Sequence, residues 1–385
     1  MIDRKSLLND LQGLLTKLEA DLLERSASAD VPDVGRALRE EYAAAQAAAR
    51  TAQSFEEWRS DAITQAAAAW VLSCVFARFL EDNGLVETPK IAGPGERLKR
   101  ARDEHELYFR AHPTLTDRDF LLAIFDGLRK HAATKDVFGE HNPIRDLPNW
   151  LSGDAAAVLI AFFQTIDPNS GVLVHDFTDP DWDTRFLGDL YQDLSEAARK
   201  KYALLQTPVF VEEFILDRTL DPAIEEFGLA RPGYETRIDS MTGRLDPVDR
   251  FKMIDPACGS GHFLLGSFAR LMDRWRKKEP GTKTIVLAQR ALDSVHGVDL
   301  NPFAIAIARF RLMLAALKEC GSRRLSDAPG FDIHLACGDS LLHGALGGDQ
   351  LSMGWTSLDH VYQPEDREAL EGILRPRSFH AVVAN

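Results

Sequence analysis

Residues 251–265 read FKMIDPACGSGHFLL, and this stretch decides the fold of the second half of the chain. Its apolar start is typical of a short strand, and the residues after its DPACGSG segment have the spacing of an amphipathic helix that runs to about residue 278. Gly259 and Gly261 allow the backbone to come close to a ligand and direct the amides of the helix start at its negative group. The stretch therefore predicts a strand, a ligand-binding loop and a helix.

Three classes of ligand compete for such a loop. A Walker loop for phosphate ends in Gly-Lys-Ser/Thr, whereas His262 and Phe263 stand in that place. A dinucleotide loop has the spacing G-x-G-x-x-G, but Leu264 occupies the third glycine position and the next glycine is Gly266. The first class is excluded and the second is disfavoured, which leaves S-adenosylmethionine as the third.

Four segments occur in a recognisable order around the loop. Residues 205–215 read LQTPVFVEEFI, residues 255–261 read DPACGSG, residues 295–299 read VHGVD, and residues 331–340 read FDIHLACGDS. In composition and order they resemble the cofactor motifs of adenine-specific DNA methyltransferases, especially type I modification subunits and fused restriction-modification enzymes. The resemblance implies an enzyme that transfers a methyl group from S-adenosylmethionine to the exocyclic amine of adenine in DNA.

The resemblance also implies which residues hold the cofactor. Thr207 would lie against its methionine end, Asp299 would accept two hydrogen bonds from its ribose diol, and Asp339 would bind its adenine amine. The other implied contacts are Asp255, Pro256, Ala257, Cys258, Gly259, Gly261, Phe263, Leu300 and Ser340. No metal site is predicted, because His262 and His296 lack further ligands at metal spacing.

Ordinary structural roles compete with these assignments. An acid between a strand and a helix is often an N-cap, so Asp299 and Asp339 can serve as caps alone. Thr207 and the proline after it also fit a generic helix start. Cys258 is not the nucleophile of a carbon-5 cytosine methyltransferase, which lies in a Pro-Cys pair that this sequence lacks. We favour cofactor contact for the two acids and a small-residue role for Cys258.

The last residues, HAVVAN at 380–385, read as a strand that leads into the first letter of the family's catalytic tetrapeptide [DN]-P-P-[YF]. The resemblance makes Asn385 the catalytic residue, whose amide oxygen would accept a hydrogen bond from the amine of a flipped-out adenine. We expect the chain to be truncated at this motif and inactive alone. Double-stranded DNA is the expected partner, bound mainly through a later part of the protein.

The first half of the chain reads as helical. Leucine spacing over residues 7–22, the alanine-rich residues 36–53 and the capping-box pattern SFEE at 54–57 all predict helices. Further helices are expected at residues 120–128 and 155–166. This lead-in, with FLEDNGL in it, resembles the long adenine methyltransferases of bacteriophage-exclusion (BREX) systems, which implies phage defence or restriction-modification and further defence subunits as partners.

The predicted fold class is α/β. Residues 1–180 form a helical domain, and residues 181–385 form the S-adenosylmethionine-binding half of a Rossmann-like methyltransferase domain. Strands near residues 253, 296, 333 and 381 should be parallel neighbours, each joined to the next through a helix. The motif loops should then gather at the carboxyl ends of the strands.

Composition and charge limit the partners. The net charge is −14, so the chain is not a basic platform for nucleic acid, and the basic clusters at residues 97–102, 274–278 and 375–377 are interpreted as solvated helix faces. The longest apolar stretch, residues 66–77, is shorter than the roughly 20 residues that a bilayer requires, so no membrane is expected. Four cysteines without a CxxC pair fit a cytoplasmic protein.

Two other functions stay open at this point. A Rossmann-like S-adenosylmethionine domain does not identify its acceptor, and protein-glutamine methyltransferases also use Asn-Pro-Pro-Tyr, so an enzyme that methylates protein or RNA is one alternative. The other is a non-catalytic fragment that binds the cofactor or a partner protein.

Overall fold

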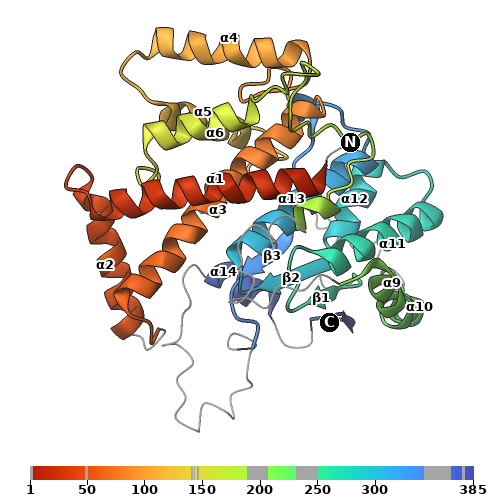
Figure 1. Cartoon of the computed structure of the whole chain (residues 1–385). Coiled ribbons are helices and arrows are strands. Elements are labelled where there is room, and N and C mark those ends of the chain that lie inside the picture. Colours follow the sequence, from red (N-terminus) through yellow and green to blue (C-terminus); the bar gives the residue numbers. More distant parts are fainter. Residues whose placement is uncertain are drawn as a thin grey trace. The chain divides into compact units, whose positions relative to one another are not determined.

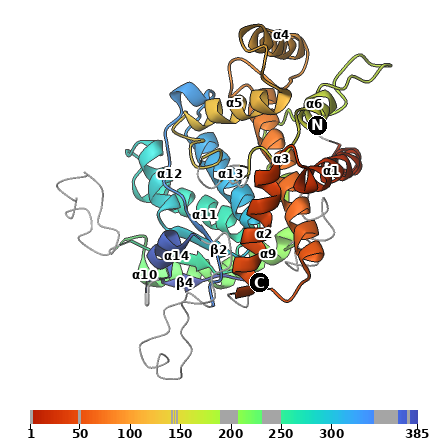
Figure 2. The same cartoon turned by 90° about the vertical axis from the view of Figure 1, so that its left-hand side faces the viewer.

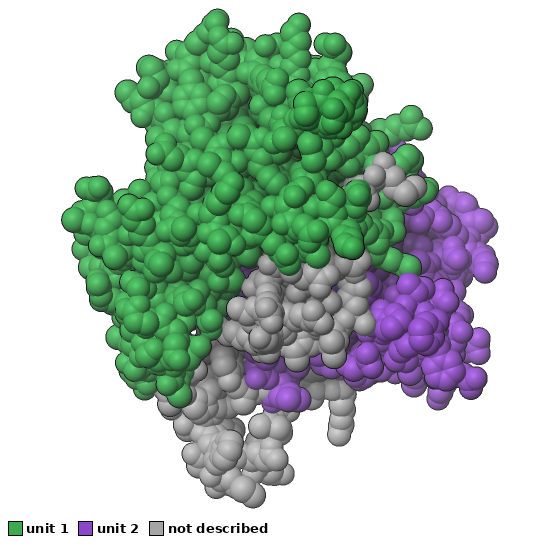
Figure 3. Space-filling model, in the orientation of Figure 1, with its two compact units in different colours: residues 1–204, 322–330 green, residues 205–321, 331–385 purple. Residues whose placement is uncertain are grey.

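The computed structural model (Figure 1) describes residues 3–47, 51–139, 142, 144, 147–188, 207–230, 250–341, 366–374 and 378–385. The chain divides into two compact units (Figure 3), one with residues 1–204 and 322–330 and the other with residues 205–321 and 331–385. The domain boundary near residue 180 stays a prediction. The basic cluster at residues 375–377 lies outside the described residues.

Helices make up the regular structure of the first unit within the described residues. They are α1 (Arg4–Ala27), α2 (Pro32–Ala47), α3 (Phe55–Asp82), α4 (Glu96–Ala111), α5 (Asp117–Arg129), α6 (Gly153–Phe163) and the 3-10 turn η4 (Leu325–Asp327). All the helices expected from the sequence are present, with ends that differ by a few residues. Helix α4 is not among the helices expected from the sequence, although residues 97–102 were interpreted as a solvated helix face; only its Leu98 and Ala101 are buried.

The long helix α3 forms the centre of the first unit. Its predicted capping box is confirmed: the Glu57 amide donates to the Ser54 hydroxyl, and the Ser54 amide donates to the Glu57 carboxylate. Every side chain from Ala67 to Asp82 is at most 6% exposed. The helix is long and apolar enough to cross a membrane, but 83% of its most apolar window is buried inside the protein, which is the position of a core helix.

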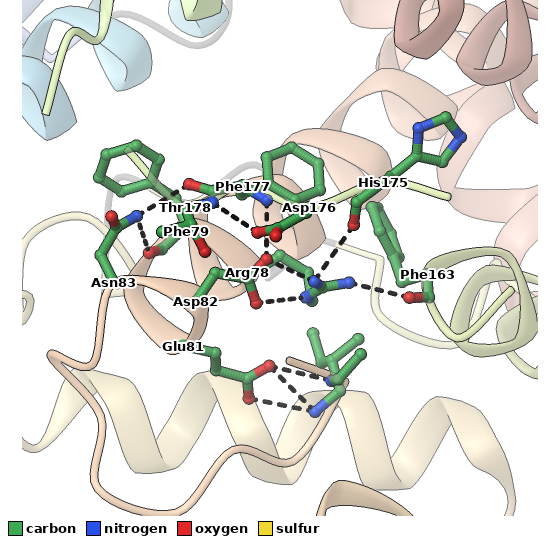
Figure 4. A network of polar contacts seen from close by, with 12 residues as sticks. Arg78, Phe79, Glu81, Asp82, Asn83, Phe163, His175, Asp176, Phe177 and Thr178 are labelled. Atoms are coloured by element: carbon green, nitrogen blue, oxygen red, sulfur yellow. Dashed lines mark hydrogen bonds and ion pairs between the residues drawn. The ribbon is translucent and has the colours of Figure 1, made fainter. Parts of the chain in front are cut away.

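A buried ion pair near the end of α3 holds a distant loop (Figure 4). The side chains of Arg78 and Asp82 are fully buried, and Nη2 of the arginine lies 2.6 Å from Oδ2 of the aspartate. The guanidinium also donates to the carbonyls of Phe163 and His175, at 2.9 and 3.4 Å. Asp82 accepts the amide of Phe177 at 2.8 Å. The pair is thus surrounded by hydrogen-bonding partners, as a buried ion pair requires.

Glu81 of α3 and its C-cap residue Asn83 also form hydrogen bonds with the backbone of neighbouring loops. The Glu81 carboxylate accepts hydrogen bonds from the three successive amides of residues 90–92, at 2.6 to 3.2 Å. Burial raises the pKa of Glu81 to about 7, although these amides oppose the shift. Asn83 donates to the Phe177 carbonyl at 2.9 Å and accepts the Asp179 amide at 2.8 Å. The FLEDNGL stretch therefore anchors loops on both sides of the helix end.

A parallel sheet of four strands organises the second unit (Figures 1 and 2). The strands are β1 (Met253–Asp255), β2 (Val295–Asp299), β3 (His334–Cys337) and β4 (Ala381–Val382), in the order β3-β2-β1-β4. The helices are α9 (Val209–Arg218), α10 (Leu220–Phe227), α11 (His262–Lys278), α12 (Thr284–Leu292), α13 (Pro302–Glu319) and α14 (Arg367–Ile373). The expected strands are confirmed as parallel neighbours joined through helices.

Helices cover both faces of this sheet. Ile254, Val298 and Ala336, one residue from each of three adjacent strands, form a cluster with residues of α14. On the opposite face Gly297 gives α11 room to approach, because a Cβ there would lie only 2.8 Å from Cδ1 of Leu264. The chain leaves β1 on one side through β2 and β3 and returns to its other side as β4, which is the switch point of a Rossmann-like sheet. The predicted α/β fold class is confirmed.

Replacing Arg78 by methionine should lower the free energy of unfolding by about 3–5 kcal/mol, because the substitution leaves the Asp82 carboxylate buried without its counter-charge. Urea denaturation followed by circular dichroism measures this loss. Arg36, whose side chain is 66% exposed in an ion pair on α2, provides the control, and its substitution by alanine should cost less than about 1 kcal/mol. Equal losses for the two variants would show that the buried pair is not needed.

Candidate functional site

The glycine loop follows β1 at the carboxyl end of the sheet. Asp255, 2% exposed, accepts a hydrogen bond from the Ala257 amide at 3.1 Å and so begins the turn. The Gly261 amide closes it by donating to the Cys258 carbonyl at 2.9 Å. Gly259 and Gly261 have φ values of +53° and +85°, in the left-handed region that favours glycine. The predicted loop is thus present between β1 and α11.

The two glycines have different surroundings. A Cβ added to Gly259 would meet no atom within 4 Å, so this part of the backbone faces open space. A Cβ on Gly261 would lie 3.0 Å from Cβ of Ala308 in α13. Gly259 is therefore the residue that leaves the backbone accessible to a ligand, while Gly261 also lets a helix pack against the loop.

Asp299, at the end of β2, is bonded directly to the glycine loop. Its Oδ2 accepts the Gly259 amide at 2.8 Å, and its Oδ1 accepts the Asn301 amide at 2.8 Å. Burial raises the pKa of Asp299 against the opposing effect of these two amides. Asn301 is the N-cap of α13, since its side chain accepts the Phe303 amide. The alternative in which Asp299 is the cap of this helix is therefore excluded.

Asp339 follows β3 at the same edge of the sheet. The amide of Gly338, the residue before it, donates to the carbonyl of Asp299 at 2.9 Å, which places the ends of β2 and β3 side by side. The carboxylate of Asp339 accepts the Leu341 amide at 2.8 Å. Helix α14 has a different N-cap, Asp366. The cofactor contact of Asp339 stays a prediction.

Thr207 and Asn385 are distant in sequence but adjacent in the structure. Thr207 directly precedes Pro208, the N-cap of α9, and Asn385 follows β4. The amide nitrogen Nδ2 of Asn385 donates to Oγ1 of Thr207 at 3.2 Å. The first of the motifs predicted from the sequence thus contacts the last one in the structure.

The remaining predicted residues differ in accessibility. Cys258 is 5% exposed, and burial raises the pKa of its thiol well above the ordinary value, which disfavours a reactive thiolate. The ring of Phe263 is also buried, at 4% exposure, whereas Leu300 is 44% exposed beside Asp299. Pro256 and Ser340 are half-buried, and Ala257 and Asn385 are exposed. The role of each in binding a cofactor stays a prediction.

Sequence reasoning missed two buried charged residues that contact this region. Arg311 of α13, 1% exposed, donates to the Ser260 carbonyl at 2.7 Å. Glu212 of α9, 6% exposed, packs over Gly266, where a Cβ would lie 2.5 Å from its Oε1. Charged residues inside otherwise apolar helices are the signal that could have found them. Gly266, which lies two residues too late for a dinucleotide motif, provides space for α9.

Three comparisons connect this chain to known proteins. Residues 234–326 match the family model of the MmeI DNA-methyltransferase domain. Over 404 aligned residues the chain is 45% identical to the adenine-specific methyltransferase PglX of Streptomyces coelicolor, covering 100% of this chain and 31% of the relative. It is 22% identical over 327 residues to a putative type II restriction enzyme and methyltransferase of Methanocaldococcus jannaschii, covering 70% of this chain and 26% of the relative.

A solved structure also aligns with most of the chain. The cryo-EM structure of a DrdV–DNA complex covers 91% of this chain and 27% of its own, with a TM-score of 0.41 and 13% identity, a similarity too low to carry an argument. The chain spans less than a third of the length of the two curated relatives, at 31% and 26%. The resemblance to adenine-specific DNA methyltransferases, and to PglX among them, is confirmed by the sequence similarities.

The pH dependence of stability should reveal the buried carboxyl of Asp255. Burial raises its pKa from an ordinary 3.8 to about 7, so between these values the folded chain holds a proton that the unfolded chain has lost. Stability should therefore fall as the pH rises through this window and level off above it. The Asp255→Asn variant has no carboxyl at this position, so its free energy of unfolding lacks this pH dependence. The difference in free energy of unfolding between wild type and the variant should change by about 4 kcal/mol at most across the window. A constant difference from pH 4 to pH 8, in urea denaturation at each pH, would contradict the raised pKa.

Proposed function

We propose that this chain holds the S-adenosylmethionine site of an adenine-specific DNA methyltransferase that acts in the cytoplasm in phage defence or restriction-modification, with BREX as the system. The observation that carries this proposal is the 2.8 Å hydrogen bond from the Gly259 amide to Asp299. It joins the glycine loop and the acid of the second strand at the switch point of the sheet, where ligands of open α/β folds bind. The similarity to PglX supports the choice of acceptor.

The residues present fit the proposed cofactor. S-adenosylmethionine supplies a methyl group activated by its sulfonium. Open space above Gly259 leaves room for the cofactor against the backbone, and each Asp299 oxygen accepts one amide and keeps a lone pair for a ribose hydroxyl. The exposed Leu300 offers an apolar surface beside that acid. The open backbone at Gly259, the carboxylate of Asp299 and the exposed Leu300 therefore support the proposed cofactor site.

Asn385 would serve the acceptor, and Thr207, the predicted contact of the cofactor's methionine end, would also orient Asn385. Because Nδ2 of Asn385 donates to the Thr207 hydroxyl, its amide oxygen is directed away from that contact and is available to accept a hydrogen bond. In the proposed reaction this oxygen holds the exocyclic amine of a flipped-out adenine, so that the nitrogen lone pair is directed at the methyl group. As the nitrogen–carbon bond forms, the sulfur–methyl bond of the sulfonium would break with its electron pair going to sulfur, and the proton lost by the amine would leave to water. Thr207 thus fixes the orientation of the catalytic amide.

The alternative acceptors receive less support. An enzyme that methylates protein or RNA would have the same sheet and glycine loop. The relatives, however, are named as an adenine-specific methyltransferase and as a restriction enzyme and methyltransferase, and the matching family model is a DNA-methyltransferase domain. Double-stranded DNA is therefore the proposed substrate, and other subunits of the defence system are proposed partners.

Cofactor binding tests the role of Asp299. Replacing it by alanine should weaken S-adenosylmethionine binding by about 2–4 kcal/mol in isothermal titration calorimetry, because charge-assisted hydrogen bonds to the ribose are lost. The control is Asp273→Ala, since Asp273 is an exposed acid on α11 outside the site. Asp299 also accepts the Gly259 amide, so folding of each variant is checked by circular dichroism. Equal affinity of wild type and a folded Asp299→Ala would refute the ribose contact.

Methyl transfer tests the acceptor. A protein extended beyond Asn385 through Pro-Pro-Tyr and a recognition domain should transfer label from tritiated S-adenosylmethionine to adenine in unmethylated DNA. Asn385→Ala in that protein should slow transfer by about 100- to 1000-fold, as expected when a hydrogen-bonding group aligned on the reacting atom is removed. Digestion to nucleosides identifies the labelled base. Label on cytosine, or on protein alone, would exclude the adenine assignment.

A further inference from the structure

Helix α13 carries two buried arginines in an otherwise apolar sequence. Arg309 and Arg311 are 4% and 1% exposed. Burial of a guanidinium is unfavourable unless its N–H groups find acceptors, so the acceptors indicate what each residue holds. Arg309 donates to the carbonyl of Leu335 in β3 at 3.0 Å. Arg311 instead donates to Ser260, to its carbonyl at 2.7 Å and to its hydroxyl at 3.3 Å.

The acceptor of Arg311 lies at the most adaptable part of the glycine loop. Ser260 stands between two glycines of left-handed φ, and glycine tolerates many backbone conformations. The loop therefore depends on outside contacts to keep one conformation. Asp299 holds the amide of Gly259 on one side of Ser260, and Arg311 holds the carbonyl of Ser260 itself.

Two residues of α13 contact the loop from the same face of the helix. Ala308 lies under Gly261, where an added Cβ would be 3.0 Å from its Cβ, and Arg311 lies three residues further along. Residues three apart on a helix are neighbours on its surface. The short side chain of Ala308 thus allows close packing, and the long side chain of Arg311 donates the hydrogen bonds. Arg309, two residues before Arg311, donates to the sheet instead.

We propose that Arg311 is a positioning residue, which fixes the Ser260–Gly261 peptide and so keeps the Gly259 backbone in the conformation that binds the cofactor. Only the identity of the cofactor in this inference rests on the proposed function. The guanidinium is 1% exposed and contacts the backbone of the loop. It acts through the loop, from the side that faces α13.

Amide hydrogen exchange tests the effect on the loop without any ligand. In the 385-residue chain, Arg311→Met should speed exchange in peptides that cover residues 258–262 by about fivefold or more, because the loop then opens locally. Arg309→Met is the matched control: it removes a buried guanidinium from the same helix but should speed exchange around Leu335 and leave the loop within about twofold of wild type. Equal exchange of the loop in the two variants would overturn the proposal.

Calorimetry with S-adenosylmethionine tests the consequence for binding. We expect Arg311→Met to bind about 10- to 100-fold more weakly than Arg309→Met, since a small displacement of a binding group is costly. Arg311→Lys, which keeps a charge and one donor, should recover part of both effects, and it replaces the methionine variant if that variant does not fold. Wild-type binding with unchanged affinity in the Arg311 variants would overturn the proposal. If wild type itself does not bind this cofactor, the proposed function fails. The difference in loop hydrogen exchange between Arg311→Met and Arg309→Met still decides whether Arg311 positions the loop.

Discussion

The hydrogen bond between the Gly259 amide and the Asp299 carboxylate is the contact on which the arrangement of the site depends. It requires a left-handed glycine after β1 and an acid at the end of the neighbouring strand, and it connects these two at 2.8 Å. Because the strands are parallel and adjacent, both groups emerge at the same edge of the sheet. The end of β3 joins them through the Gly338 amide, which donates to the carbonyl of Asp299. Three strand ends are therefore fixed relative to one another by backbone groups and one carboxylate.

Much of this arrangement could be predicted from the sequence because local patterns determine it. The DPACGSG segment specified a strand, a turn and a helix, and the strands that followed read as apolar runs ended by polar residues. The capping box of α3 was equally local, since Ser54 and Glu57, three residues apart, each accept the other's backbone amide. Parallel pairing then followed from the helices between the strands. Features fixed by neighbours in sequence were thus accessible to prediction.

Features fixed by tertiary contacts were not accessible in this way. Helix α4 buries only two residues, so its sequence has no apolar stripe to predict it. The contact of Arg311 with Ser260 depends on where α13 meets the loop, so the sequence of the helix does not identify this partner. Gly266 is similar: the sequence showed only that it is misplaced for a dinucleotide motif, and the structure shows that Glu212 and Leu216 occupy the space beside it. The same glycine can serve a ligand or a helix, and only the three-dimensional neighbour decides between them.

The polar end of α3 has a consequence for how this chain can vary. Arg78, Glu81, Asp82 and Asn83 hold the loops around them mainly through backbone amides and carbonyls (Figure 4). A backbone group is the same whichever side chain it carries, so such anchoring places little demand on the sequence of the loop. Substitutions can therefore accumulate in the loops while the anchoring side chains stay fixed. The end of α3 can therefore bind loops of many different sequences. Substitutions of the four anchoring residues themselves should destabilise the protein most.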